Sequence, residues 1–100
     1  MMKFGLTDRE YKDLAKLVID PLKNTGARVY VFGSRARGTH QRFSDIDILV
    51  ESSQDLSKVL GQISEALEQS NFPYKIDLVE ERNLAPSYVP YVKADRQEVP

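Results

Sequence analysis

The sequence has no cysteine, a net charge of only −1 and no long apolar run. Without cysteine the chain has neither disulfides nor thiolate metal ligands, a composition typical of the cytoplasm, where we expect the protein to act. No apolar stretch approaches the roughly 20 residues that cross a membrane, and the N-terminus lacks the apolar segment of a signal peptide. The 14 basic and 15 acidic residues create no global positive field, so direct binding to nucleic acid is not favoured. The single histidine, His40, is interpreted as a solvated loop residue.

Hydrophobic residues alternate between helical and strand spacing along a chain that is long enough for one domain with a single core. Helices are predicted over about residues 8–23 and 56–67, and strands over 28–32, 44–50 and 75–80. Two prolines interrupt the segment 83–93, which is expected to form a short helix or turn, and 94–100 is expected to form a short edge strand. Pro21 is expected to kink or end the first helix because it has no backbone N–H.

This succession of elements predicts an α/β (α+β) fold, with a small mixed β-sheet and helices packed on one side. The expected order is α-β-(loop or short α)-β-α-β-α. The connection between the first two strands is too short for an ordinary crossover helix, so these two strands are predicted to run antiparallel.

Two aspartates lie two residues apart on the second predicted strand. Asp45 and Asp47 therefore face the same way, about 6.6–6.8 Å apart, and Asp77 joins them if the third strand pairs beside the second. Three carboxylates on one face repel one another unless a cation lies between them, and Mg²⁺ prefers oxygen ligands. Two such ions about 3.5–4 Å apart support phosphoryl or nucleotidyl transfer. The alternative for the aspartates is a solvated strand face.

A small-residue turn and a basic loop connect the first two predicted strands. Gly33 permits close approach of the backbone to an anion, and Ser34 adds a hydroxyl at a turn whose N–H groups form a phosphate nest. Arg35, Arg37 and Arg42 follow on the loop and are able to neutralise a polyphosphate. Taken singly, each arginine is equally well explained as a solvated charge, and the Gly-Ser pair alone as an ordinary turn.

Together, these residues resemble the signature of the minimal nucleotidyltransferases, the small branch of the DNA polymerase β-like superfamily. In FGSRARGTHQRFSDIDILV, Gly33-Ser34 is followed by ten residues and then by Asp45-Ile46-Asp47, while Asp77 resembles the family's third carboxylate. The resemblance spans about residues 7–80 and implies one nucleotidyltransferase domain over residues 1–100. It also implies roles for the site residues. The metal ligands would be Asp45, Asp47 and Asp77, with Asp77 alternatively the base for the acceptor, and the triphosphate ligands Gly33 and Ser34, joined by Arg35, Arg37 and Arg42.

The resemblance further implies a partner protein. Small members of this family are paired with a helical HEPN protein as the antitoxin of a toxin–antitoxin pair, and some transfer AMP from ATP to a tyrosine of that partner. We therefore expect an Mg²⁺-dependent adenylyltransferase in a hetero-oligomer, with a contact surface near the YVPYV stretch at 88–92. The alternative is a non-catalytic antitoxin that masks its partner by binding and retains a regulatory or vestigial nucleotide site.

Overall fold

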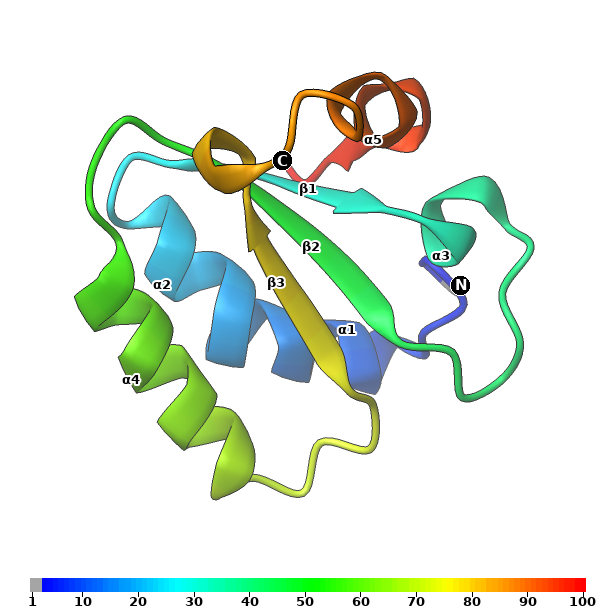
Figure 1. Cartoon of the computed structure of the whole chain (residues 1–100). Coiled ribbons are helices and arrows are strands. Elements are labelled where there is room, and N and C mark those ends of the chain that lie inside the picture. Colours follow the sequence, from blue (N-terminus) through cyan, green and yellow to red (C-terminus); the bar gives the residue numbers. More distant parts are fainter. Residues whose placement is uncertain (1–2) are drawn as a thin grey trace.

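The computed structural model describes residues 3–100 and alternates helices with strands in the predicted order (Figure 1). The elements are α1 (Asp8–Leu14), η1 (Ala15–Ile19), α2 (Asp20–Lys23), β1 (Arg28–Phe32), α3 (Ser34–Arg37), β2 (Ile46–Glu51), α4 (Ser57–Glu68), β3 (Ile76–Glu80), η2 (Glu81–Asn83), α5 (Val89–Asp95) and β4 (Gln97–Glu98). No helix within the described range is long and apolar enough to cross a membrane.

The four strands form one mixed sheet in the order β3-β2-β1-β4. β1 and β2 run antiparallel, as the short connection predicted, whereas β3 runs parallel to β2. The register sets Asp47 of β2 beside Phe32 of β1 on one side and Asp77 of β3 on the other. The expected edge strand in the C-terminal tail is confirmed as β4, which pairs with β1.

The first helical stretch passes through Pro21 without ending there. Its start follows from a capping box, in which Thr7 and Glu10 each accept a hydrogen bond from the other's backbone N–H. The turn then widens into the π-helix η1, where the N–H of Asp20 donates to the carbonyl of Ala15. This wider turn changes the hydrogen-bond ladder just before Pro21, so the predicted interruption takes the form of a change in helix type.

The core lies between the sheet and the helices α1, α2 and α4, which cover one of its faces (Figure 1). Alternate residues of β1 and β2 point into it and are almost fully buried, namely Val29, Val31, Ile46, Ile48 and Val50. Each such burial contributes roughly 1.5–3 kcal/mol. The residues between them, including Asp47, therefore face away from these helices.

The predicted placement of all helices on one side does not hold for α5, which lies on the opposite side from α4, above β1 (Figure 1). Arg96, at the end of α5, stacks its guanidinium over the ring of Tyr30, 4.2 Å from the centroid. The same guanidinium pairs with Glu51 at 3.4 Å and Glu81 at 3.7 Å. These contacts hold α5 over one end of the second face of the sheet. The other end of that face carries Asp47.

Candidate functional site

Gly33 and Asp47 meet at the end of β1. The φ of Gly33 is +75°, a conformation that glycine adopts without strain. A Cβ added to Gly33 would overlap the Oδ2 of Asp47. We predicted that the backbone at Gly33 approaches an anionic ligand closely. In the structure, this backbone closely approaches the carboxylate of Asp47 in the same chain. The glycine is required by this contact as well as by the turn.

Ser34 begins α3, a single helical turn between Gly33 and Gly38. The turn is closed by backbone hydrogen bonds from Arg37 to the carbonyl of Gly33 and from Thr39 to the carbonyl of Ser34. Gly38 ends it with φ of +79°, in the left-handed conformation typical of a helix C-terminus. Ser34 is half-buried, and its backbone follows directly on the contact between Gly33 and Asp47.

β3 pairs beside β2, which is the condition on which we expected Asp77 to join the other aspartates, and Asp47 and Asp77 are direct neighbours on these parallel strands. Asp45, however, is not part of a strand. β2 begins at Ile46, one residue later than Asp45, so the predicted strand start at residue 44 is wrong. The physical reason is that the carbonyl of Ser44 accepts hydrogen bonds from the side chain of Arg35, at 2.9 and 3.1 Å. Those bonds hold the chain in a loop up to Asp45, whose side chain is exposed.

The three aspartates still act on one another electrostatically. Burial raises the pKa of Asp47 above its ordinary value, and the negative charges of Asp77 and Asp45 raise it further, while Arg37 opposes them. Within residues 3–100, however, no three acidic or histidine side chains lie close enough together to hold a metal ion. The predicted convergence of Asp45, Asp47 and Asp77 on a metal is thus not formed in this conformation. The carboxylates nevertheless fit the chemistry of Mg²⁺, because their mutual repulsion favours a cation between them and because Mg²⁺ prefers oxygen ligands.

Arg35 has a different role from the predicted one. Its side chain is 2% exposed and donates to the carbonyls of Phe4, Arg42 and Ser44 at 2.8–3.2 Å. Its guanidinium also lies 4.7 Å from the centroid of the Tyr74 ring. A buried guanidinium is stable only when its donors are used in this way. The structure therefore assigns Arg35 to holding the loop against the N-terminal segment, in place of the predicted phosphate contact.

Arg37 is the arginine that acts on the site carboxylates, since its charge lowers the pKa of Asp47. Its guanidinium also pairs with Asp95 of α5 at 2.8 Å. One residue away, the carbonyl of Ala36 accepts a hydrogen bond from the side chain of Gln97 at 2.7 Å. Sequence reasoning missed Asp95 and Gln97, because no local pattern connects them to residues about 60 positions earlier.

Of the remaining loop residues, Arg42 and Phe43 are exposed, whereas the ring of His40 is packed. Arg42 is exposed, and its guanidinium lies 5.1 Å from the centroid of the Phe43 ring, which is itself exposed. His40, interpreted from the sequence as solvated, instead packs its ring where a Cβ on Gly5 would have to lie. Its Nδ1 is buried, with no hydrogen-bond partner among the residues described. His40 is packed because the N-terminal segment folds back over the loop and places Gly5 against its ring.

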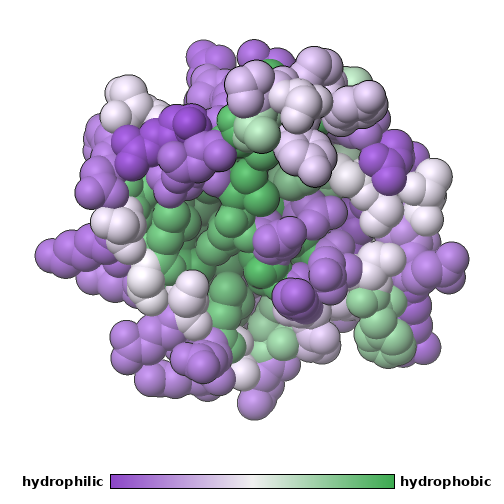
Figure 2. Space-filling view, in the orientation of Figure 1, coloured by the Kyte–Doolittle hydropathy of each residue, from purple (hydrophilic) through white to green (hydrophobic). Residues whose placement is uncertain are grey.

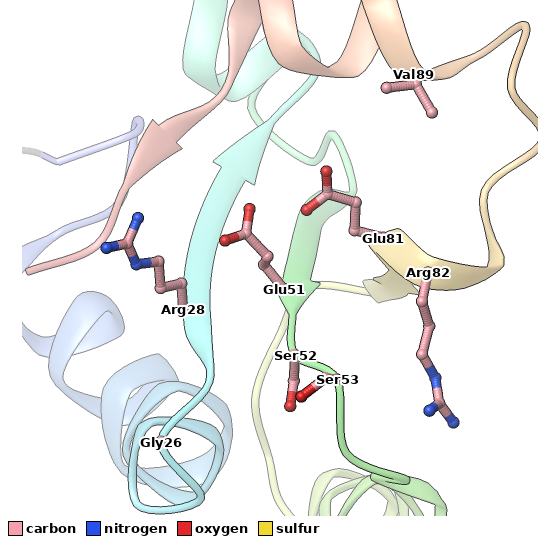
Figure 3. Close-up of a pocket in the computed structure, with 8 residues that line it drawn as sticks. All are labelled: Gly26, Arg28, Glu51, Ser52, Ser53, Glu81, Arg82 and Val89. Atoms are coloured by element: carbon pink, nitrogen blue, oxygen red, sulfur yellow. The ribbon is translucent and has the colours of Figure 1, made fainter.

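A cavity of about 550 Å³ lies at the other end of β2, far along the strand from Asp47 (Figure 3). The carboxylates of Glu51 and Glu81 point into the same space beneath α5. Both carboxylates pair with Arg96, and Glu81 also pairs with Lys93 at 3.5 Å. These compensated charges make the cavity a junction between α5 and the sheet rather than a second site of the same kind.

The fold and this arrangement of residues are those of a nucleotidyltransferase. Residues 12–99 match the family described as nucleotidyltransferase domain, and the chain belongs to that family. It is 32% identical over 83 residues to "Probable protein adenylyltransferase MntA" of Haemophilus influenzae, covering 80% of this chain and 72% of that protein. The resemblance inferred from the Gly-Ser and Asp-x-Asp pairs is thereby confirmed.

Solved structures of toxin–antitoxin proteins share the fold. One, described as a toxin–antitoxin with AMP-PNP, is similar with a TM-score of 0.60 and 25% identity over 83% of this chain and 69% of that chain. Another belongs to a complex of a tri-AMPylated Shewanella oneidensis HEPN toxin with an MNT antitoxin. Its TM-score is 0.54, with 21% identity over 89% of this chain and 67% of that chain. The predicted nucleotidyltransferase fold is confirmed by these likenesses.

Proposed function

We propose that this chain is a protein adenylyltransferase that transfers AMP from ATP to a tyrosine of a HEPN-type partner toxin and thereby acts as its antitoxin. The observation that carries the proposal is the pairing of Asp47 with Asp77 beside the tight turn at Gly33. Support also comes from membership of the nucleotidyltransferase family and from the likeness to MntA and to a toxin–antitoxin structure with AMP-PNP.

The reaction is an in-line displacement at the α-phosphorus of ATP. The tyrosine oxygen forms a bond to that phosphorus, the bond from phosphorus to the oxygen bridging to the β-phosphate breaks, and pyrophosphate leaves. The proton of the hydroxyl passes to a carboxylate. Asp77, which is exposed on β3, would receive it in the alternative in which it acts as the base and not as a metal ligand. Transfer to a tyrosine therefore needs no covalent intermediate on this chain.

The other residues bind and orient the nucleotide. Mg²⁺, proposed as two ions, would be held by Asp45, Asp47 and Asp77, and when bound it neutralises these carboxylates and polarises the phosphate oxygens. The triphosphate would lie against the backbone of Gly33 and Ser34, whose N–H groups would donate hydrogen bonds to its oxygens. Among the arginines, Arg37 and Arg42 keep exposed guanidinium groups and are the remaining candidates for the polyphosphate.

The test is an intact-mass measurement of both proteins after incubation with ATP and Mg²⁺. The expected result is a partner that gains one or more AMP units with the native chain and none with Asp47→Asn. Glu65→Gln makes the same change of charge at an exposed position of α4 and should leave transfer intact. Absence of Mg²⁺–ATP binding by the folded native chain would contradict the proposal.

A second candidate is a masking antitoxin that neutralises its partner by binding alone. It is favoured by one observation, namely that Asp45, Asp47 and Asp77 do not lie close enough together in this conformation to hold a metal ion. A tight complex without any gain of mass would support it. So would continued protection of cells from the toxin by the double variant Asp45→Asn with Asp47→Asn.

A further inference from the structure

β3 is an edge strand whose second side pairs with no strand in the described part of the chain. The carbonyl of Lys75 accepts a hydrogen bond from the N–H of Ile46 on β2 at 2.9 Å. Backbone groups alternate in direction along a strand, so those of Ile76, Leu78 and Glu80 point away from the sheet. Such an unpaired row of donors and acceptors is a template for another strand.

An apolar surface lies beside this free edge. Figure 2 shows a band of hydrophobic surface alongside β3, on the side toward α4. We call it the α4–β3 band; it consists of the half-buried side chains of Val59, Leu60, Leu67, Phe72, Ile76 and Leu78. At one end it opens into a cavity of about 290 Å³ lined by Leu67, Phe72 and Ile76, with Glu68 and Lys75 also in the lining. The edge therefore offers apolar contacts as well as backbone hydrogen bonds.

The free edge and the proposed reaction site share the residue Asp77. Ile76 and Leu78 pack against the core on the helix side, so Asp77 between them projects to the opposite face, beside Asp47. A strand added along β3 would lie about 4.8 Å away and would turn every second side chain to the face of Asp77. A side chain directly opposite Asp77 would have its Cβ within about 4.5–5.5 Å of the Asp77 Cβ.

We propose that the acceptor polypeptide docks as an extended segment on the free edge of β3, with its hydroxyl side chain beside Asp77. The residues on either side of the acceptor then point toward α4 and are apolar, because they meet the α4–β3 band. This inference rests on the proposed function, since it takes the chain to act on a polypeptide hydroxyl. Main-chain hydrogen bonds supply affinity, and the alternating contacts supply the choice of acceptor.

Two peptides of identical composition test this geometry. The first, Lys-Val-Ser-Val-Tyr-Val-Ser-Val-Lys, places valines on both sides of the tyrosine. The second, Lys-Val-Val-Ser-Tyr-Ser-Val-Val-Lys, places serines there. Without nucleotide, we expect the first peptide to slow amide hydrogen exchange at Ile76, Leu78 and Glu80, and the second to have no such effect. With ATP and Mg²⁺, transfer of AMP to the first peptide should exceed transfer to the second by about tenfold or more.

Variants of α4 separate docking from nucleotide binding. Leu67→Glu sets a charge in the α4–β3 band, whereas Gln62→Glu makes a matched change at an exposed position of the same helix. We expect Leu67→Glu to abolish the protection of β3 by the first peptide and to lower AMP transfer about tenfold or more, with ATP affinity unchanged. Unchanged ATP affinity also shows that the variant is folded, and the peptide comparison on the native chain needs no variant.

The outcomes distinguish this inference from the proposed function. Protection of β3 by neither peptide, equal effects of both, or normal transfer by Leu67→Glu would overturn edge docking. Concentration-dependent protection of β3 without peptide would also overturn it, because the occupant would then be a second copy of the chain. If the native chain neither binds Mg²⁺–ATP nor modifies an intact HEPN partner, the proposed function fails, while hydrogen exchange still reports whether the first peptide docks.

Discussion

The backbone of Gly33 lies so close to the carboxylate of Asp47 that no Cβ fits between them. Asp47 lies on β2, and Gly33 directly follows the antiparallel strand β1, whose last residue, Phe32, pairs with Asp47. The turn that begins α3 and the carboxylate proposed to bind Mg²⁺ are thus fixed relative to each other by a backbone contact. A change at Gly33 should therefore affect the site through Asp47 and not only through the turn.

Gly33→Ala should abolish nucleotide binding as well as lower stability. The backbone of Gly33, with φ of +75° and ψ of −154°, lies in a region that is essentially restricted to glycine, so an alanine there costs about 1–3 kcal/mol. The new methyl group must also displace the Asp47 carboxylate or α3. Gly38→Ala is the control for a positive φ without a steric contact, since Gly38 lies in the left-handed helical region, with φ of +79°, and has open space around its Cβ position. We expect both variants to lower the urea midpoint, and only Gly33→Ala to lose Mg²⁺–ATP binding by calorimetry. Equal ATP affinities in the two variants would contradict the role given to this contact.

Arg35→Lys should destabilise the fold and leave the polyphosphate contacts themselves intact. A lysine cannot reach the carbonyls of Phe4, Arg42 and Ser44 together, and leaving buried acceptors unpaired costs at least about 2 kcal/mol. The measurement is the free energy of unfolding in urea, with Arg42→Lys as the control at an exposed position, expected within about 0.5 kcal/mol of the native chain. Unchanged stability together with weakened ATP binding by Arg35→Lys would restore the phosphate role predicted from the sequence.

Asp95→Asn should increase the affinity for ATP. Asp95 holds the guanidinium of Arg37 at 2.8 Å, and a triphosphate at the Gly33–Ser34 turn would compete for the same group. Because the pair is partly exposed, its loss should change stability by less than about 1 kcal/mol, whereas Arg37→Ala should weaken ATP binding. Titrations at low and high salt measure both effects, and the difference between native and variant chains should shrink as salt screens the pair. A weaker affinity in Asp95→Asn would instead mean that Asp95 positions Arg37 for the nucleotide.

The parts of the site that follow from sequence are those set by short spacings. The strand pattern around residues 28–32, the turn at Gly33 and the alternation that places Asp47 and Asp77 each between core-facing neighbours all depend on residues within a few positions. The predicted start of β2 at residue 44 is wrong because the carbonyl of Ser44 accepts a hydrogen bond from the side chain of Arg35, nine residues earlier. No periodicity in the sequence reports such a contact.

Contacts between distant segments account for the other differences. His40 is packed because the N-terminal segment returns to it and presents Gly5, and Arg37 is restrained because α5 brings Asp95 to it from 58 positions away. α5 itself lies on the second face of the sheet because Arg96 stacks there on Tyr30 and forms ion pairs with Glu51 and Glu81. Each of these is a tertiary interaction of a charged or aromatic side chain. The local sequence pattern does not predict the partner of such a side chain.

Asp47→Asn should remove catalysis and yet stabilise the fold at neutral pH. The pKa of Asp47 in the folded chain is raised above its ordinary value of 3.8, first by burial and then by Asp77 and Asp45. A raised pKa means that folding disfavours the ionised carboxylate, so the stability associated with this group is fully present below pH 3.8 and is lost as pH rises through the folded pKa. The neutral amide of Asp47→Asn avoids that loss.

The advantage of Asp47→Asn should therefore be largest near pH 7 and disappear below the ordinary pKa of an aspartate. Thermal unfolding of both chains between pH 3 and pH 7 measures it, with the exposed Glu65→Gln as the control for a simple change of net charge. Mg²⁺ should raise the unfolding midpoint of the native chain at pH 7 and leave that of Asp47→Asn nearly unchanged, because the cation relieves the same repulsion among carboxylates. A native chain that is more stable than the variant at pH 7 without Mg²⁺ would show that Asp47 is held by favourable contacts, and that its charge is not the cause of strain at the site.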